Sequence, residues 1–219
     1  MEKIVVGGRK KINLETWERR AAFQFFKDFT EPYHGVCLRV DCTEAYRYAK
    51  RHQLSVFLSL LHRSLVAARQ VENFRTRIVD GDAWLYEQIH GGSAVGRANG
   101  TIGLGHYQFY ARMDDFVREA AIELDRVRQR EDIERYPEAN LIRYSVLPWF
   151  DFTSISHARN LSHADSAPLI TFGKITEADG RRSMPVSIHV HHALVDGQHV
   201  AQFVDRFQYC LDNPDADPS

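Results

Sequence analysis

The sequence predicts an α/β fold, a two-layer sandwich in which a mixed β-sheet is covered by helices. Stretches with the helical spacing of apolar residues alternate with stretches of period-two spacing, which is typical of strands. They do not follow the regular strand–helix–strand order of a parallel sheet, so a mixed sheet is expected. The 219 residues, 44% of them hydrophobic, can bury a sizeable core, and a single domain over residues 1–219 is the simplest organisation.

The first half of the chain is predicted to alternate between helices and short strands. Thr43 and Ser55 are good helix caps because their hydroxyls can accept hydrogen bonds from backbone N–H groups. Pro32 and Gly35 mark a loop before the first strand. The expected elements are helices over 15–29, 43–52 and 55–72, and strands over 36–41, 76–79 and 83–89. Four phenylalanines of the first helix are expected to be mainly core: Phe23, Phe25, Phe26 and Phe29.

The second half of the chain is predicted to contain mostly strands. Gly100, Gly103 and Gly105 do not have the order of the dinucleotide-binding Gly-x-Gly-x-x-Gly motif, so they are interpreted as turn or bulge positions. The expected elements are a strand over 106–111, an amphipathic helix over 114–130, strands over 141–147, 169–175 and 184–191, and a helix over 199–211.

Charge and cysteine content exclude several classes of function. A net charge of −1 and a pI near 6.8 give no electrostatic reason to expect nucleic acid or an anionic membrane as a partner. Cys37, Cys42 and Cys210 are odd in number and include no Cys-x-x-Cys pair, so neither a disulfide framework nor a thiolate zinc site is indicated. The apolar residues after Met1 are too few for a signal peptide or a membrane span, so we expect a cytoplasmic protein.

A histidine pair near the C-terminus, His191 and His192, is the strongest indication of function. It ends a stretch of alternating apolar residues and precedes an Asp196-Gly197 turn, after which the apolar spacing becomes helical. The pair therefore lies at a strand-to-helix junction. His192 has the parity of the apolar residues and is predicted to project inward, and an imidazole held beside a turn is suited to accept a proton.

Two alternatives for these side chains are a metal site and an ordinary core position. His189, His191 and His192 could form a metal cluster, but strand alternation sends His191 and His192 to opposite faces. No cysteine or extra carboxylate completes the ligand set, so we predict no metal site. A lone His192 would be interpreted as a core histidine, and its interpretation as a base therefore depends on other segments of the chain.

Four other segments, together with this pair, resemble one family in chain order. His191-His192-x-x-x-Asp196-Gly197 resembles the signature of coenzyme A-dependent acyltransferases of the chloramphenicol acetyltransferase superfamily. The other similar segments are Trp17-Glu18-Arg19-Arg20-x-x-Phe23, Phe74-Arg75 followed by Asp80-Gly81, Ser145-Val146-Leu147-Pro148-Trp149 and Ala167-Pro168-Leu169-Ile170-Thr171. The resemblance extends from Trp17 to Cys210, nearly the whole chain.

The resemblance implies transfer of an acetyl group from acetyl-CoA to a hydroxyl of chloramphenicol or a related small hydroxylated acceptor. Because the thiol of coenzyme A is a good leaving group, no acyl-enzyme is required, and direct transfer in a ternary complex is the simpler scheme. By resemblance, His192 is the general base, Ser145 donates to the oxyanion and Thr171 acts through a bound water. Asp196 and Arg19 form a pair in the family and support the turn that carries the imidazole.

The resemblance also implies a homotrimer whose active sites lie between subunits, with His192 from one subunit and much of the acceptor pocket from the next. Phe26 stands where the family commonly has a tyrosine of the acceptor pocket. Lys174 follows the matched threonine strand and is a candidate contact for a phosphate of coenzyme A. Val195 and Gln198 replace the cysteine and the aromatic residue that usually flank the Asp-Gly turn, so the identity of the acceptor stays open.

Two other functions also stay open. The chain could be a dihydrolipoamide acyltransferase core, although that group usually has Asp-His-Arg ahead of the turn and is accompanied by lipoyl domains. It could instead be a non-catalytic relative that uses the fold as a binding module. A thiol-release assay with acetyl-CoA and several hydroxylated acceptors distinguishes an acetyltransferase from both.

Overall fold

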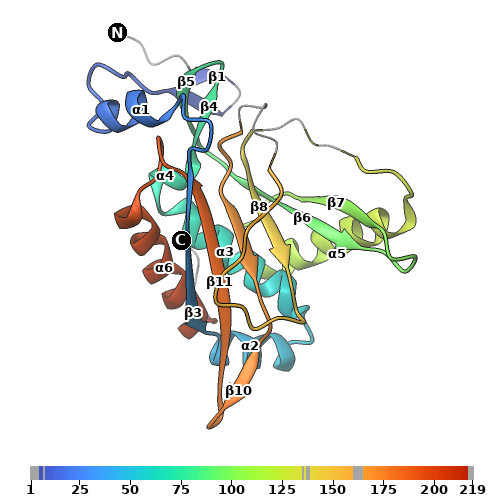
Figure 1. The fold of residues 1–219 in the computed structure, drawn as a ribbon. Coiled ribbons are helices and arrows are strands. Elements are labelled where there is room, and N and C mark those ends of the chain that lie inside the picture. Colours follow the sequence, from blue (N-terminus) through green and yellow to red (C-terminus); the bar gives the residue numbers. More distant parts are fainter. Residues whose placement is uncertain (1–4, 7, 135, 137–138, 160–164, 217–219) are drawn as a thin grey trace.

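The computed structural model describes residues 5–6, 8–134, 136, 139–159 and 165–216, and Figure 1 shows their arrangement. The strands of the larger sheet are β3 (Tyr33–Asp41), β6 (His90–Gly96), β7 (Ile102–Tyr107), β8 (Leu141–Val146), β9 (Leu169–Phe172), β10 (Thr176–Ala178) and β11 (Arg181–His191). Their order is β10-β11-β9-β8-β6-β7, and β3 pairs with the opposite edge of β11. The β6–β8 and β8–β9 pairs are parallel and the others antiparallel, which confirms the predicted mixed sheet.

A smaller sheet lies at one end of the molecule (Figure 1). It has the order β1-β2-β5-β4, formed by β1 (Val5–Val6), β2 (Arg9–Lys11), β5 (Asp82–Tyr86) and β4 (Thr76–Val79). The first helix, α1 (Arg20–Phe26), lies beside this sheet, and the strand β3 runs from that end into the larger sheet.

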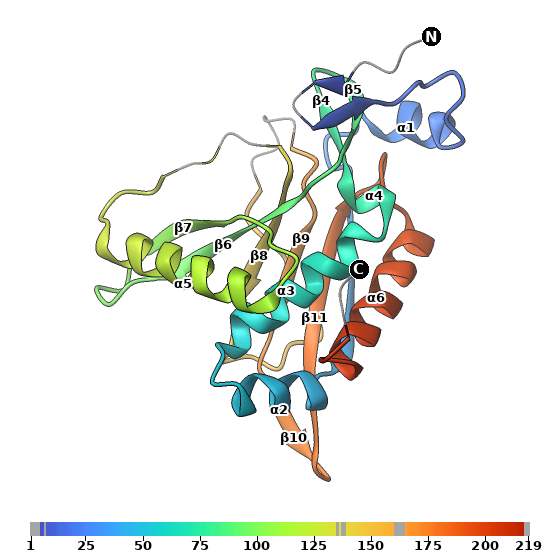
Figure 2. The ribbon, with the colours of Figure 1, turned by 180° about the vertical axis from the view of Figure 1, so that it is seen from behind.

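Helices cover one face of the larger sheet, as Figure 2 shows. They are α2 (Thr43–Arg51), α3 (Val56–Arg69), α5 (Met113–Gln129) and α6 (Gly197–Asp212), with the short α4 (Glu72–Arg75) between α3 and β4. The helix α3 is central, and its Leu61 and Leu65 are fully buried against the sheet. Within the described residues, no helix has both the length and the apolar composition needed to cross a membrane.

On the opposite face of the larger sheet no helix is found among the described residues, and the segment that follows β8 partly covers it. A Cβ atom added to Gly173 would lie 2.8 Å from a Phe152 ring carbon, and His157 contacts both Thr171 and His189. We call this the helix-free face. Its side chains are therefore the ones left for a ligand or another subunit to contact.

The strand β6 was not predicted from the sequence. It contains three glycines, which lower the propensity for strand. In the fold one of them, Gly91, has a packing role, because a Cβ atom there would lie 3.1 Å from a side-chain carbon of Leu61. The absence of side chains thus lets α3 lie close to the sheet.

Helix α1 differs from its prediction in length and burial. It covers Arg20–Phe26 instead of residues 15–29, because the chain before it forms turns, in one of which Arg20 N–H donates to Trp17 O. Among the phenylalanines, Phe23 is 1% exposed, whereas Phe25 and Phe29 are 65% and 44% exposed. The prediction that this group is mainly core was therefore wrong for the two outer rings.

Two histidines are buried in this fold, His62 in α3 and His191 at the end of β11, with exposed fractions of 3% and 4%. Burial lowers the pKa of each imidazole from 6.5 to about 4. Both rings are therefore neutral at pH 7, and the folded protein resists their protonation until well below the ordinary pKa of histidine.

Acidification between about pH 6.5 and pH 4 is expected to destabilise the fold, because the unfolded chain binds protons at these two positions and the folded chain does not. Each imidazole contributes at most about 1.4 kcal/mol per pH unit. We expect the His62→Gln/His191→Gln double variant to show a shallower pH dependence of the free energy of unfolding, measured with urea. An equally steep dependence would contradict the burial argument.

Candidate active site

The turn of residues 192–196, between β11 and α6, is closed by the side chain of Asp196. Its Oδ1 accepts from the backbone N–H groups of Gln198 and His199, and His199 Nδ1 accepts from the backbone N–H of Asp196. This reciprocal arrangement is a capping box, and it fixes the start of α6. The Asp-Gly pair therefore determines where the turn that carries His192 ends.

His192 lies one residue beyond the end of β11, which ends at His191. Strand alternation does not apply at His192, so the prediction that its side chain projects inward was wrong. His191 is the buried ring, at 4% exposure, and His192 is half-buried on the turn. The backbone N–H of His192 donates to Pro32 O at 2.8 Å, which attaches the turn to the segment before β3.

One nitrogen of the His192 ring is engaged and the other is available. Nδ1 lies 3.3 Å from the carbonyl oxygen of Val195. Because a carbonyl oxygen only accepts, Nδ1 carries the proton in this hydrogen bond and Nε2 carries the lone pair. Nε2 has no hydrogen-bond partner among the residues that the structure describes. This tautomer can accept a proton at Nε2.

A second imidazole, that of His34 in β3, donates to the same carbonyl oxygen. Its Nε2 lies 3.2 Å from Val195 O, and its ring centroid is 4.5 Å from that of His192. Burial lowers the pKa of His34, so this ring is neutral at pH 7. Sequence reasoning missed His34 because Val195 follows it by 161 residues and no local motif marks it. The register that pairs His34 with Val190 brings it to the turn.

Phe26 stacks on the imidazole of His192. The ring centroids are 4.1 Å apart and the planes are inclined by 26°. Phe25 and Phe29 pack against Phe26, with centroid distances of 4.9 and 5.1 Å. We call Phe25, Phe26 and Phe29 the aromatic cluster. It covers one face of the His192 ring and so limits the access of water to it.

Arg19 joins the N-terminal segment to the turn through three donors of its guanidinium. Nη1 donates to Asp196 Oδ2 at 2.5 Å, Nη2 to His192 O at 2.7 Å and Nε to Ala193 O at 3.1 Å. Burial alone would raise the pKa of Asp196, but the hydrogen bond from Arg19 and the charges of His199 and Arg19 outweigh it and lower this pKa. Arg19 and Asp196, paired by resemblance in the sequence, are thus in contact and hold the turn.

Ser145 and Thr171 lie opposite each other on β8 and β9, and Thr171 lies opposite Ser187 on β11. Side chains opposite each other on neighbouring strands point to the same face, so these three hydroxyls share the helix-free face. Thr171 Oγ1 is 2.9 Å from His157 Nε2, and Ser187 Oγ is 3.3 Å from His189 Nδ1. We call these five residues the hydroxyl–histidine cluster. Sequence reasoning missed the contact of His157, which follows an irregular segment.

His192 lies apart, within one chain, from the three hydroxyls of the hydroxyl–histidine cluster. From Ser187, the residue of β11 in register with Thr171, the chain continues for five residues to His192. At about 3.3 Å per strand residue, this separates His192 from the row of Ser145 and Thr171 by about 17 Å. The structure thus brings the predicted residues together as two groups instead of one.

Lys174 lies still further from His192. It follows Phe172, which pairs with Val186, so it is beyond the hydroxyl–histidine cluster along the sheet. Its side chain is exposed, and its backbone N–H donates to Phe150 O at 2.8 Å. Lys174 therefore belongs to the side of the molecule that carries Ser145.

The two groups offer complementary chemistry. The turn provides an imidazole whose Nδ1 is held by Val195 O and whose Nε2 faces no described hydrogen-bond partner, which suits a general base. The helix-free face provides hydroxyl donors, which suit stabilisation of a developing oxyanion. Within the described part of the chain, no three His, Cys, Asp or Glu side chains are arranged to hold a metal ion.

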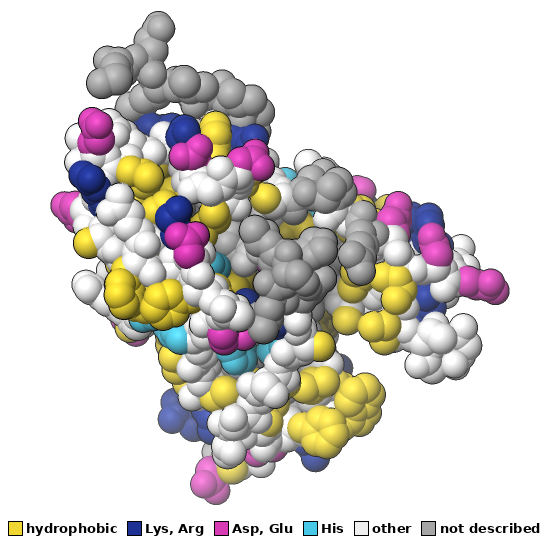
Figure 3. Space-filling view, turned by 45° about the horizontal axis from the view of Figure 1, so that its top comes forward, with side chains coloured by type: hydrophobic (Ala, Val, Ile, Leu, Met, Phe, Trp, Pro, Cys, Tyr) yellow, Lys and Arg dark blue, Asp and Glu magenta, His cyan; other side chains and the backbone are white. Residues whose placement is uncertain are grey.

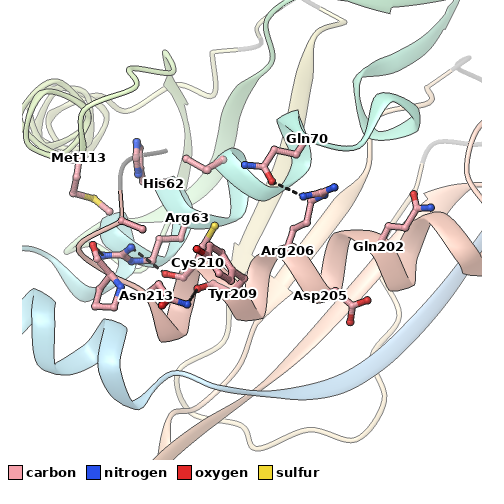
Figure 4. A pocket seen from close by; sticks show the side chains of 13 residues that line it. His62, Arg63, Gln70, Met113, Gln202, Asp205, Arg206, Tyr209, Cys210 and Asn213 are labelled. Carbon is pink, nitrogen blue, oxygen red and sulfur yellow. Dashed lines mark hydrogen bonds between the residues drawn. The ribbon is translucent and has the colours of Figure 1, made fainter. Parts of the chain in front are cut away.

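A cavity of about 700 Å³ lies between α3 and α6, away from both groups (Figure 4). Arg63 lines it and donates from Nη1 to Cys210 O and from Nη2 to Pro214 O. The guanidinium of Arg63 thereby ties the segment after α6 to α3. None of the residues predicted for the active site lines this cavity.

Two substitutions of Asp196 distinguish its role as the cap of α6 from its ion pair with Arg19. Asp196→Asn removes the charge facing Arg19 but keeps an oxygen that can cap α6, whereas Asp196→Ala removes both. We expect Asp196→Ala to lower the free energy of unfolding by about 1 kcal/mol more than Asp196→Asn, measured with urea at pH 7. Equal losses would show that the side-chain cap does not stabilise α6.

Comparison with known proteins identifies the family. The family model "Chloramphenicol acetyltransferase" matches residues 9–208 of this chain. The chloramphenicol acetyltransferase of Bacillus pumilus is 23% identical over 204 residues, covering 92% of this chain and 93% of that protein. One from Escherichia coli is 25% identical over 217 residues, covering 96% of this chain and 97% of that protein.

Solved structures support the same conclusion. One named chloramphenicol acetyltransferase superposes with a TM-score of 0.84 at 30% identity, covering 93% of this chain and 99% of that chain. The dihydrolipoamide acetyltransferase of Azotobacter vinelandii has a TM-score of 0.65 at 18% identity, covering 84% and 82%, and shares the fold. The family match over most of the length, the close superposition on a solved structure and the relatives' names agree: the chain belongs to the chloramphenicol acetyltransferase family, and it is an acyltransferase.

Proposed function

We propose that the protein transfers an acetyl group from acetyl-CoA to a hydroxyl of chloramphenicol or a related small acceptor, with His192 as general base. The observation that carries this proposal is the tautomer of His192. Its Nδ1 donates to Val195 O, which leaves the lone pair on Nε2. Family membership supports the reaction class, and the geometry of the turn supports the choice of base.

The reaction proceeds without an acyl-enzyme. His192 Nε2 takes the proton of the acceptor hydroxyl as its oxygen attacks the thioester carbonyl carbon. The carbonyl π electrons move to oxygen, and the hydroxyl of Ser145 donates a hydrogen bond to this oxyanion. When the intermediate collapses, the C–S bond breaks and the thiolate of coenzyme A takes the proton back from His192. A thiol, with pKa near 8.5, is a far better leaving group than an alkoxide.

Asp196 and Arg19 act as positioning residues in this scheme. They contact neither substrate, but Arg19 binds the carbonyl oxygen of His192 and the side chain of Asp196 together. Phe26 limits the freedom of the imidazole by stacking on it, and contacts the acceptor at the same time. Thr171, held by His157, orients a water for the intermediate.

The proposal places the active site between two subunits of a homotrimer. The separation of about 17 Å along β11 between His192 and the row of Ser145 supports this, since one chain cannot bring them to one carbonyl group. An edge strand and exposed aromatic side chains also favour contact between subunits. β3 has a free edge among the described strands, and Trp149 and Phe150 are 73% and 59% exposed.

Lys174 is proposed to contact a phosphate of coenzyme A. It is exposed and lies on the Ser145 side of the sheet, beside Phe150. Because an exposed charge pair is worth less than about 1 kcal/mol, we expect Lys174→Gln to raise the KM for acetyl-CoA by about two- to fivefold with kcat unchanged. Lys50→Gln, on α2, is the matched control. An unchanged KM in Lys174→Gln would remove the assignment.

We propose that the protein acts in the cytoplasm. The free cysteines, of which Cys37 is exposed and Cys42 is buried, suit a reducing compartment. Recovery of the protein in a membrane or extracellular fraction would contradict this assignment.

Replacement of His192 tests the proposed base. We expect His192→Ala to lower kcat for thiol release from acetyl-CoA by about 100- to 10,000-fold with chloramphenicol as acceptor, because proton transfer from the hydroxyl is lost. His52→Ala, an exposed histidine at the end of α2, is the matched control and should keep full activity.

Three outcomes of this assay would contradict the proposal. Unchanged activity in His192→Ala would exclude this imidazole as the base. Transfer to dihydrolipoamide alone would favour the dihydrolipoamide acyltransferase core. Binding of coenzyme A by the wild-type protein without thiol release on any hydroxylated acceptor would favour a binding module.

A further inference from the structure

The side chains around Ser145 on the helix-free face are unusually polar. Beside Ser145 in the sheet lie Thr171 and Ser187, both fully buried, and each hydroxyl is bonded to an imidazole, that of His157 or His189. Figure 3 shows histidine side chains reaching the surface on this side of the molecule. A pocket for an apolar acceptor group would be lined instead with aliphatic or aromatic side chains.

The two imidazoles are held in a defined arrangement. The rings of His157 and His189 meet edge to face, with centroids 5.3 Å apart and planes inclined by 89°. His189 also lies directly over Gly35 of the neighbouring strand, where a Cβ atom would be 2.4 Å from His189 Nε2. Glycine at this position of β3 therefore makes the room that the ring of His189 occupies.

Each imidazole keeps one nitrogen for a ligand. His157 uses Nε2 to contact Thr171, and His189 uses Nδ1 to contact Ser187. The other two nitrogens, His157 Nδ1 and His189 Nε2, have no hydrogen-bond partner among the described residues and are not among the fully buried polar atoms. Burial lowers the pKa of both rings, so at pH 7 each is neutral and can donate or accept.

Two arginines near this cluster are already paired, and the exposed Lys174 is assigned above to coenzyme A. Arg159, which lies over the ring of Tyr33, forms an ion pair with Glu31. Arg143 forms one with Asp165 at 2.5 Å. Neither cation is available to neutralise an anionic acceptor, so the ligand that suits this region is polar and uncharged.

We infer that the acceptor is a neutral, polyhydroxylated molecule of the sugar type, whose secondary hydroxyl groups bind His157 Nδ1 and His189 Nε2 while its reacting hydroxyl lies beside Ser145. This inference rests on the proposed acetyltransferase function and narrows its acceptor. A site built to bind hydroxyl groups rejects a molecule that lacks them, because its own polar atoms are then left unpaired. The aromatic cluster at His192 covers the base and does not contact these hydroxyl groups.

Two matched acceptors test the inference. Methyl α-glucopyranoside and tetrahydropyran-2-methanol both have a six-membered ether ring and a primary hydroxyl, but the second lacks the secondary hydroxyl groups. We expect the wild-type protein to use the glycoside with a kcat/KM about 10- to 100-fold higher, measured by thiol release from acetyl-CoA. A ratio near one, or a preference for tetrahydropyran-2-methanol, would overturn the inference.

Variants of the two histidines assign the preference to this cluster. We expect His157→Leu to bring the ratio toward one by lowering turnover of the glycoside, and His157→Gln, which keeps a donor and an acceptor, to retain part of it. His52→Leu is the matched control and should keep the ratio. His189→Gln provides the second test if thermal unfolding shows that His157→Leu is unstable. An unchanged ratio in all variants of these two histidines would overturn the inference.

Failure of this inference is distinguishable from failure of the proposed function. If the wild-type protein acetylates chloramphenicol but neither ring alcohol, or both equally, the acceptor class is wrong and the acetyltransferase function stands. If no acceptor, including chloramphenicol, releases thiol from acetyl-CoA, the function itself is wrong.

Discussion

The guanidinium of Arg19 is the contact on which the geometry of the turn depends. Three of its N–H donors reach three different groups of residues 192–196, two of them backbone carbonyl oxygens. Because Arg19 binds backbone carbonyl oxygens, it fixes the main chain of the turn relative to the N-terminal segment. The same segment leads into α1, so Phe26 reaches the imidazole of His192 through this connection. The three hydrogen bonds of Arg19 therefore position both the proposed base, His192, and the Phe26 ring that stacks on it.

The fold also separates His192 from the hydroxyls of Ser145 and Thr171 within one chain. Strand β11 carries Ser187 near its middle, in one row with Thr171 of β9 and Ser145 of β8, and ends beside His192. A strand is stiff, so no rearrangement of the turn moves the imidazole by the length of five residues. The base and the hydroxyls can serve one reaction when two chains contribute them. Within that arrangement, His157 and His189 bind the acceptor's hydroxyl groups, and the aromatic cluster covers the base, with Phe26 also in contact with the acceptor.

Several parts of this picture were predictable from the sequence. Helix α2, helix α3 with its Ser55 cap, the strands β4 and β8 and the junction at Asp196-Gly197 follow from local residue patterns, which depend on neighbours along the chain. Thr43 was predicted to cap α2, but it is the first helical residue, and its hydroxyl accepts from the backbone N–H of Arg182 instead. The strand β6 did not, because its three glycines, of which Gly91 lets α3 approach the sheet, remove the strand pattern. His34 and His157 were missed because their partners are brought to them by strand register and by an irregular segment. The predicted orientation of His192 was wrong because the alternation was extended to a residue that lies on the turn, one position beyond the end of β11.

Recovery of activity from two inactive chains tests the division of the active site most directly. His192→Ala and Ser145→Ala chains would be produced together in equal amounts, purified as mixed assemblies and assayed for thiol release. If each site takes its imidazole from one chain and its serine from the next, random assembly leaves both intact in about a quarter of the sites, and the activity should recover to about that fraction of wild type. Mixed assemblies no more active than the two single variants would contradict an active site shared between subunits.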